Sequence, residues 1–185
     1  VKPGSSSSSL ICGTDLGSTI LAACGMKQLK EMTGVSFLRQ LLGGQAEGRQ
    51  YVFSERGWHW GPLTRTDGLD LSRSITTKRY RYIYNALPNR SYTPVDMSGK
   101  DAWKAIQSAH AAGRLSPLHE RLFFQNPRPI VELYDLRNDP SELNNLAGKK
   151  SVAEIERTLL EQLESWMIRE HDYLPLPTHA LQNTK

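Results

Sequence analysis

Residues 73–87 read RSITTKRYRYIYNAL, and this stretch decides the fold. Its residues alternate in polarity on both sides of a break near Lys78, which predicts a β-hairpin with strands at residues 73–77 and 80–85. The alternation places three tyrosines on one face of the second strand: Tyr80, Tyr82 and Tyr84. The other face carries Arg79, Arg81 and Ile83. Because tyrosines on a strand commonly pack under a helix, we expect another element to cover the aromatic face.

Further strands and helices are predicted on both sides of this hairpin. Short strands are expected at residues 50–56 and 130–134. Helical patterns occupy residues 14–25, 34–44, 100–113 and 116–125. A last helix has one apolar stripe, formed by Val152, Ile155, Leu159, Leu163 and Trp166. The predicted fold class is therefore α+β, with a small antiparallel sheet of about four strands packed by the C-terminal helix.

The first helix gives an expectation about its own burial. Thr14 or Asp15 is a suitable N-cap and Gly25 a suitable stop, so we attribute Asp15 to capping rather than to catalysis. Leu16, Ile20 and Ala23 form its apolar stripe, and we expect the helices of residues 14–44 to expose apolar surface that makes the chain aggregation-prone unless a partner covers it. Cys12 and Cys24 flank the helix at a separation too great for a disulfide, so both are expected to be free and buried.

Residues 133–148, LYDLRNDPSELNNLAG, could be a site or a local structural motif. Asp139 before Pro140 is typical of a helix N-cap followed by proline at the first helical position, and Glu142 is placed to reach back to the cap. Asp135, Asp139 and Glu142 do not have the spacing of a calcium loop. We therefore interpret the stretch as a strand followed by a capped turn, and expect no metal there.

Composition limits the classes of function. The 185 residues are 38% hydrophobic and 23% charged, which is typical of a globular domain. No apolar run approaches the roughly 20 residues that cross a bilayer, so no membrane partner is expected. The start, VKPGSSSSSL, lacks the apolar core of a signal peptide and an initiator Met, so we expect an upstream portion to be missing.

A basic cluster without acids lies between residues 73 and 90. Its members are Arg73, Lys78, Arg79, Arg81 and Arg90. Such a surface favours anionic partners such as sulfated sugars, phosphates or nucleic acid, although it equally suits a solvated strand edge. Nucleic acid is not expected, because none of the usual nucleic-acid-binding motifs is present.

Several blocks together resemble the sulfatase family, whose members hydrolyse sulfate esters and sulfamates. ELYDLRNDPSELNNLAG is similar to the C-terminal signature of that family. Other blocks occur in the family's order: GTDLGSTILAACGM, MTGVSFLRQLLGG, YVFSERGWHW and RSITTKRYRYIYN. NALPNRSYTPVDM and WMIREHDYLP resemble the N-sulfoglucosamine sulfohydrolase (heparan sulfamidase) branch.

The resemblance implies a division of the chain. Family members have a large α/β catalytic domain and a smaller C-terminal domain with an antiparallel sheet and a packed helix. Residues 1–49 are then a remnant at the edge of the catalytic domain, a loop plus two helices, and residues 50–185 are the C-terminal subdomain. The parent enzyme is expected in the periplasm, outside the cell or in a lysosome-like compartment.

The chain departs from the family pattern where the chemistry is concentrated. The family converts the Cys or Ser of a C/S-x-P-x-R motif to formylglycine and binds calcium through Asp and Asn side chains. Cys12 is followed by GTDL and Cys24 by GMKQL, so neither forms the motif. No catalytic or metal-binding residue is therefore predicted here, and the chain is expected to be inactive without its N-terminal catalytic domain.

Substrate contacts are predicted in the stretch ERGWHW. The family's C-terminal domain closes one side of the active-site pocket, and the candidate substrate-binding residues here are His59, Glu55, Arg56 and Trp58. Trp58 offers a flat face for a sugar, and His59, which matches a histidine of the sulfamidase branch, can donate to a sulfate or hydroxyl oxygen. The alternatives are a surface loop pinned by tryptophan packing, and a non-catalytic module that binds sulfated glycans or a protein through the basic hairpin and this loop.

Overall fold

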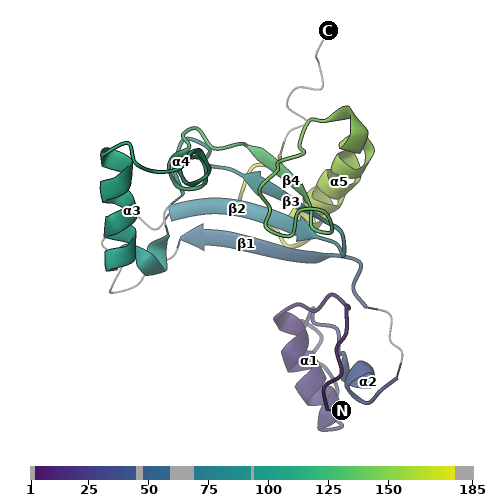
Figure 1. Cartoon of the computed structure of the whole chain (residues 1–185). Helices are drawn as coiled ribbons and strands as arrows, with labels where there is room; N and C mark the ends of the chain where they lie inside the picture. Colours follow the sequence, from purple (N-terminus) through teal and green to yellow (C-terminus); the bar gives the residue numbers. More distant parts are fainter. Residues whose placement is uncertain (1–2, 45–47, 59–68, 93, 178–185) are drawn as a thin grey trace.

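The computed structural model describes residues 3–44, 48–58, 69–92 and 94–177, and shows an α+β fold (Figure 1). The strands are β1 (Val52–Trp58), β2 (Leu69–Thr76), β3 (Tyr80–Asn85) and β4 (Val131–Asp135). The helices are α1 (Thr14–Ala23), α2 (Leu38–Leu41), α3 (Asp101–Ala111), α4 (Pro117–Phe124) and α5 (Ala153–Arg169), with 3-10 turns η1 (Val95–Met97) and η2 (Lys150–Val152). The predicted fold class is confirmed.

The four strands form one antiparallel sheet in the order β1-β2-β3-β4. The predicted hairpin is present, with Ile75 opposite Tyr82 and Tyr82 opposite Leu133. β1 begins and ends two residues later than predicted, and β2 begins four residues earlier, because the charged and glycine-containing ends of these strands pair with each other as far as Trp58 and Leu69. A register shift after Arg56 accommodates Gly57 in β1.

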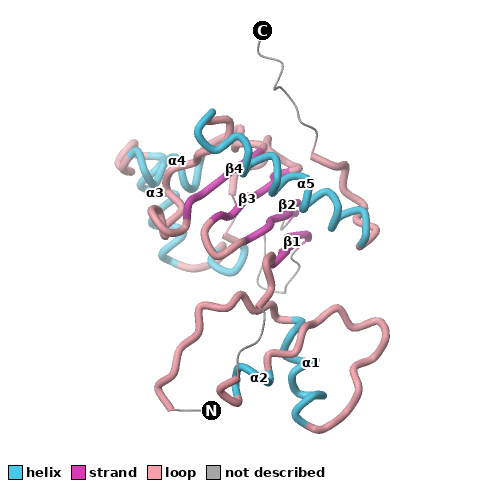
Figure 2. The backbone as a smooth tube through the Cα atoms, turned by 90° about the vertical axis from the view of Figure 1, so that its right-hand side faces the viewer, coloured by secondary structure: helices cyan, strands magenta, loops and turns pink. Residues whose placement is uncertain are grey.

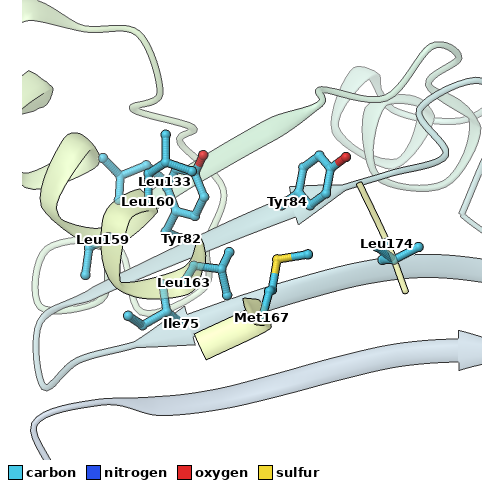
Figure 3. Packing of buried hydrophobic residues seen from close by; sticks show 9 residues of the cluster. All are labelled: Ile75, Tyr82, Tyr84, Leu133, Leu159, Leu160, Leu163, Met167 and Leu174. Atoms are coloured by element: carbon cyan, nitrogen blue, oxygen red, sulfur yellow. The ribbon is translucent and has the colours of Figure 1, made fainter. Parts of the chain in front are cut away.

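Helix α5 covers one face of the sheet and forms the core with it (Figure 3). Leu159, Leu163 and Met167 of the helix pack on Ile75, Tyr82 and Leu133 of the strands, and all six side chains are almost completely buried. The predicted stripe of the last helix and the inward tyrosine face are therefore confirmed. Removing such side chains from water contributes about 1.5–3 kcal/mol each.

A buried ion pair ties the segment after α5 to the sheet. Arg73 of β2 is 1% exposed, and its guanidinium donates two hydrogen bonds to the carboxylate of Asp172. The ring of Tyr173 lies 5.6 Å from the same guanidinium, and Leu174 joins the core. A lysine could not give this two-pronged contact, because its ammonium is a single point donor.

The α1 and α2 segment lies apart from the sheet in both views (Figures 1 and 2). The expected exposure of apolar surface on this segment is confirmed, since Leu16 is 56% exposed and Ile20 is 62% exposed. The polar side of α1 is buried instead, through Asp15, Ser18 and Thr19. The segment folds around these polar groups, so the apolar side of the helix is left outward.

Asp15 explains this reversed helix. Its carboxylate accepts hydrogen bonds from the backbone N–H groups of Cys12 and Val35, at 2.8 and 2.7 Å, and from the guanidinium of Arg49. The N-cap is Gly13, so the expected capping role of Thr14 or Asp15 is not observed, although the role of Asp15 is structural. A Cβ on Gly34 would lie 2.2 Å from the carbonyl oxygen of Thr14, so only glycine permits this close approach.

Helices α3 and α4 form a hairpin at one end of the sheet (Figure 1). Ser116 caps α4 by accepting from the N–H of His119, and Pro117 occupies the first helical position, both as predicted. Trp103 of α3 stacks on Phe124 of α4, with ring centroids 5.8 Å apart. His110 stacks on the same phenylalanine, which assigns that histidine to packing.

The predicted strand followed by a capped turn is confirmed by β4 and by the turns of residues 136–148, but Asp139 does not begin a helix. Asp139 still caps backbone N–H groups, those of Leu143 and Asn144, at 3.1 and 2.7 Å. Glu142 has a φ of 55° and pairs with Arg81 rather than reaching back to the cap. Glu142 therefore pairs with Arg81 of β3 instead of making the local contact with the cap that a helix start would require.

Two further predictions concern the state of the cysteines and the presence of a membrane-spanning helix. Cys12 and Cys24 are free, as expected, but Cys24 is exposed and Cys12 half-buried, so their predicted burial is wrong. Among the helices of the described residues, none combines the length and the apolar character needed to cross a membrane.

Candidate functional site

The structure places the four predicted substrate-binding residues unequally. His59 lies outside the described residues, and so does the side chain of Trp58, whose backbone ends β1. Glu55 and Arg56 are described, and they lie inside β1 rather than at its end, because the strand continues two residues beyond its predicted boundary. The two are neighbours in an extended strand, so their side chains leave opposite faces of the sheet.

Glu55 faces the side of the sheet that α5 covers. It stands opposite Arg73 in the ladder, and its carboxylate lies 3.7 Å from that guanidinium. Its side chain is 69% exposed, because β1 is the edge strand and the main partner of Arg73 is Asp172. Glu55 is therefore a solvent-facing carboxylate able to accept hydrogen bonds from a ligand.

Arg56 faces the other side, where three elements hold it. Its guanidinium lies 3.5 Å from the carboxylate of Asp70 on β2 and 5.0 Å from the ring centroid of Tyr92. Asp70 is buried and also accepts two hydrogen bonds from Arg128, at 2.6 and 3.2 Å. Arg56, Asp70 and Arg128 form what we call the arginine bridge. Two guanidinium groups share one carboxylate there, so the bridge carries a surplus positive charge.

A pocket of about 460 Å³ opens beside the edge of β1. It is lined by Glu55, Arg56, Gly57, Tyr92, Pro94, Val95, Asp96 and Met97, and we call it the β1 pocket. Its volume lies within the range of about 300–1,000 Å³ that is typical of small-molecule sites. Its lining includes an arginine, a tyrosine and the carboxylate residue Asp96, with Glu55 at its edge, a combination that suits a polar ligand with both donors and acceptors.

Sequence reasoning missed Tyr92, Asp70 and Arg128. Tyr92 lies in the loop before η1, Asp70 at the start of β2 and Arg128 before β4, so no local spacing relates them. The sheet brings them together, because β2 places Asp70 next to the end of β1 and the loop before β4 returns Arg128 to the same carboxylate. A motif search could not have found this group.

The basic cluster of residues 73–90 is largely neutralised by acids from distant segments. Arg73 pairs with Asp172, Arg79 with Asp135 and Arg81 with Glu142. The hydrogen bonds from Arg79 hold the pKa of Asp135 below its usual value. A glycan-binding module based on an exposed basic hairpin is therefore not favoured, since three of its five cations are already engaged.

The residues present do not match the metal and nucleophile that the family resemblance implies. Within the described ranges, no group of three or more His, Cys, Asp or Glu side chains could hold a metal ion. His110 and His119 stack on phenylalanine rings, so packing accounts for both. Calcium and formylglycine chemistry is therefore not assigned to any of the described residues.

Sequence comparisons identify relatives over nearly the whole chain. No family model matches. Two curated ulvan-active sulfatases of Formosa agariphila match it, with 32% identity over 174 residues and 29% identity over 177 residues. Each match covers 94% of this chain but only 32% and 28% of the respective sulfatase, so the chain spans about a third of their length.

Comparison with solved structures supports the fold. A 2-O GAG sulfatase superposes with a TM-score of 0.54 at 20% identity, over 85% of this chain and 25% of that chain. A phosphonate monoester hydrolase of Agrobacterium radiobacter gives 0.50 at 20% identity, over 84% and 24%. The sheet with its covering helix is thus an architecture found within larger hydrolases. This chain is accordingly related in sequence to the sulfatase family, and corresponds to about a third of a curated member.

Proposed function

We propose that this chain is the C-terminal part of a sulfatase that hydrolyses sulfate esters or sulfamates of sugars, and that it forms one wall of the substrate pocket. The observation that supports this most directly is the β1 pocket, where Asp70 and Tyr92 fix Arg56 in a chain similar to ulvan-active sulfatases. A fixed guanidinium is a strong, geometrically specific donor to sulfate, carboxylate or hydroxyl oxygens.

Each polar group of the pocket has a role in this proposal. Arg56 donates hydrogen bonds to an anionic or hydroxyl oxygen of the sugar. Asp96 accepts from a sugar hydroxyl, and the ring of Tyr92 offers an apolar face to the pyranose. Glu55, whose side chain leaves the other face of the sheet at the same edge, is a candidate for a sugar hydroxyl that reaches past β1. His59 and Trp58 follow directly in the sequence and remain candidates for the same wall. In a full-length parent, His59→Ala is expected to lower kcat/KM; an unchanged value would remove His59 from the site.

A sulfated saccharide is the proposed substrate class. The sequence blocks resemble the sulfamidase branch, and the curated relatives are ulvan-active sulfatases, so both point to sulfated sugars although the named substrates differ. The mixed donors and acceptors of the β1 pocket suit a sugar better than a purely apolar aryl group. By the same resemblance, we propose that the parent enzyme is exported.

The N-terminal segment is proposed to join this chain to a separate catalytic domain. Residues 1–49 are proposed to belong to the edge of that domain, and residues 50–185 to the C-terminal subdomain. Several large apolar side chains of the first segment are exposed: Ile11, Leu16, Ile20, Met26, Leu29, Val35 and Leu42. Their burial against another part of the protein would remove this apolar surface from water.

Catalysis is proposed to reside in that other part. Sulfate release requires the formylglycine nucleophile and a metal to withdraw charge from the sulfate oxygens, and no residue here is assigned to either task. The chain alone, incubated with calcium and either an aryl sulfate or N-sulfoglucosamine, is expected to release no sulfate. Turnover above a blank without protein would overturn this part of the proposal.

Binding tests the substrate wall itself. A sulfated ulvan disaccharide is titrated into the chain and into Arg56→Met, with Arg137→Met as the matched control because Arg137 is exposed and lies outside the β1 pocket. We expect about a tenfold loss of affinity for Arg56→Met, which corresponds to one charge-assisted hydrogen bond of about 1.4 kcal/mol. Equal affinities for both variants would contradict the proposed role of Arg56.

A further inference from the structure

A second pocket shares Tyr92 with the β1 pocket. We call it the α4 pocket; it has a volume of about 330 Å³ between α4, β4 and the loop after β4. Its polar lining includes Arg121, Arg128, Glu132, Tyr134 and Glu142. Because Tyr92 lines both pockets, the two are neighbours.

The arginine bridge connects the two pockets electrostatically. Arg56 lines the β1 pocket and Arg128 lines the α4 pocket, and the buried carboxylate of Asp70 holds both guanidinium groups. The Arg128 contacts with Asp70 use its two terminal nitrogens, at 3.2 and 2.6 Å. Its Nε–H is buried and has no acceptor among the described residues. A buried donor without a partner costs about 1–3 kcal/mol, so an oxygen supplied by a ligand would be stabilising.

Acceptors in the α4 pocket are already oriented. The Glu132 carboxylate accepts from Asn85 Nδ2 at 2.6 Å and from the hydroxyl of Tyr134. Burial, followed by this hydrogen bond, raises the pKa of Tyr134 well above its usual value, so the hydroxyl stays a neutral donor at physiological pH. Glu142 is fixed by Arg81. Carboxylates and guanidinium groups in fixed positions beside an aromatic ring are suited to the hydroxyls and the apolar face of a sugar.

We infer that the α4 pocket is a second saccharide subsite, next to the sugar bound in the β1 pocket. This inference rests on the proposed function, because it places the sulfated sugar of the substrate in the β1 pocket and the adjoining sugar of the same chain in the α4 pocket. The substrate class is then an oligosaccharide or polysaccharide that spans Tyr92, rather than a single sulfated sugar. The α4 pocket binds through Arg128, Glu132 and the ring of Tyr92.

Chain length of the ligand tests the inference. The sulfated monosaccharide of ulvan and the sulfated ulvan disaccharide that contains it are titrated into the 185-residue chain, with affinity measured by calorimetry or NMR. We expect the disaccharide to bind about tenfold more tightly, which corresponds to about 1.4 kcal/mol from the second subsite. Leu122→Trp, on the part of α4 that lines the pocket, is expected to abolish this gain while leaving monosaccharide affinity unchanged.

Leu118→Trp is the matched control, because Leu118 lies one turn earlier on α4, is similarly exposed and does not line the α4 pocket. Arg121→Ala, a truncation of an exposed side chain in the pocket lining, is a second variant if a tryptophan disturbs folding, and should reduce the gain. Equal affinity of the two saccharides, or an unchanged gain in both pocket variants, would overturn the second subsite alone. If neither saccharide binds, the proposed function itself fails.

Discussion

At the scale of single residues, the ion pair between Arg73 and Asp172 has the largest expected effect on stability. Both side chains are almost completely buried, so removing one charge would leave the other without compensation. Asp172→Asn is expected to lower the free energy of unfolding by about 3–5 kcal/mol. Urea denaturation measures this. Glu170→Gln is the control, since its partner Arg169 is largely exposed and the change should remain below about 1 kcal/mol. Similar midpoints for both variants would contradict the role of the pair.

Asp15 is expected to make the N-terminal segment sensitive to acid. Although burial raises its pKa, hydrogen bonds from Arg49 and from the N–H groups of Val35 and Cys12 lower it to about 2. The folded-state pKa is below the unfolded value, so the stabilisation is complete above about pH 4 and is lost as the pH falls toward 2. The loss amounts to about 2 kcal/mol.

Hydrogen-exchange protection of the Val35 amide, which donates to Asp15, measures this effect. Protection should fall between about pH 4 and pH 2 in the natural chain. In Asp15→Asn it should be weaker at every pH and should lose that dependence. Protection that stays constant down to about pH 2 in the natural chain would show that Asp15 does not hold the segment.

At the scale of elements, the sequence predicted the parts whose pattern and packing agree. The hairpin, the last helix and the Ser116 cap were predictable because alternation, a helical stripe and cap chemistry each act locally. The helix start at Asp139 was wrongly predicted, because Glu142 pairs with Arg81 of β3. For the site, Arg56 was predictable, but Asp70, Tyr92 and Arg128 were not, since sheet pairing and a returning loop bring them together.

Helix α1 gives a prediction of its own, because its apolar side is outward. Leu16→Gln combined with Ile20→Gln should reduce self-association of the chain without lowering its unfolding midpoint, since both side chains are more than half exposed. Analytical ultracentrifugation measures association. The control is Leu159→Gln, in the core, which should instead destabilise the fold. A monomeric natural chain at all concentrations would contradict an interface on this face.

At the scale of the whole molecule, two surfaces are suited to different partners. The α1 face is suited to another protein domain, and the β1 and α4 pockets on the sheet are suited to a saccharide. The core formed by α5 and the sheet supports these surfaces, and its buried residues line neither pocket. On this proposal the chain binds the substrate, and the rest of the sulfatase supplies the nucleophile and the metal that hydrolyse it.

NMR titration of the isotope-labelled chain with a sulfated ulvan disaccharide tests whether the β1 pocket binds a saccharide. We expect saturable shifts at the Arg56 Nε–H and at the backbone amides of Glu55, Gly57 and Met97, which line the β1 pocket. Amides of the paired hairpin turn near Lys78 should not move. Absence of shifts at the β1 pocket at saccharide concentrations well above the millimolar range, or shifts confined to the basic hairpin, would show that the β1 pocket is not a saccharide site.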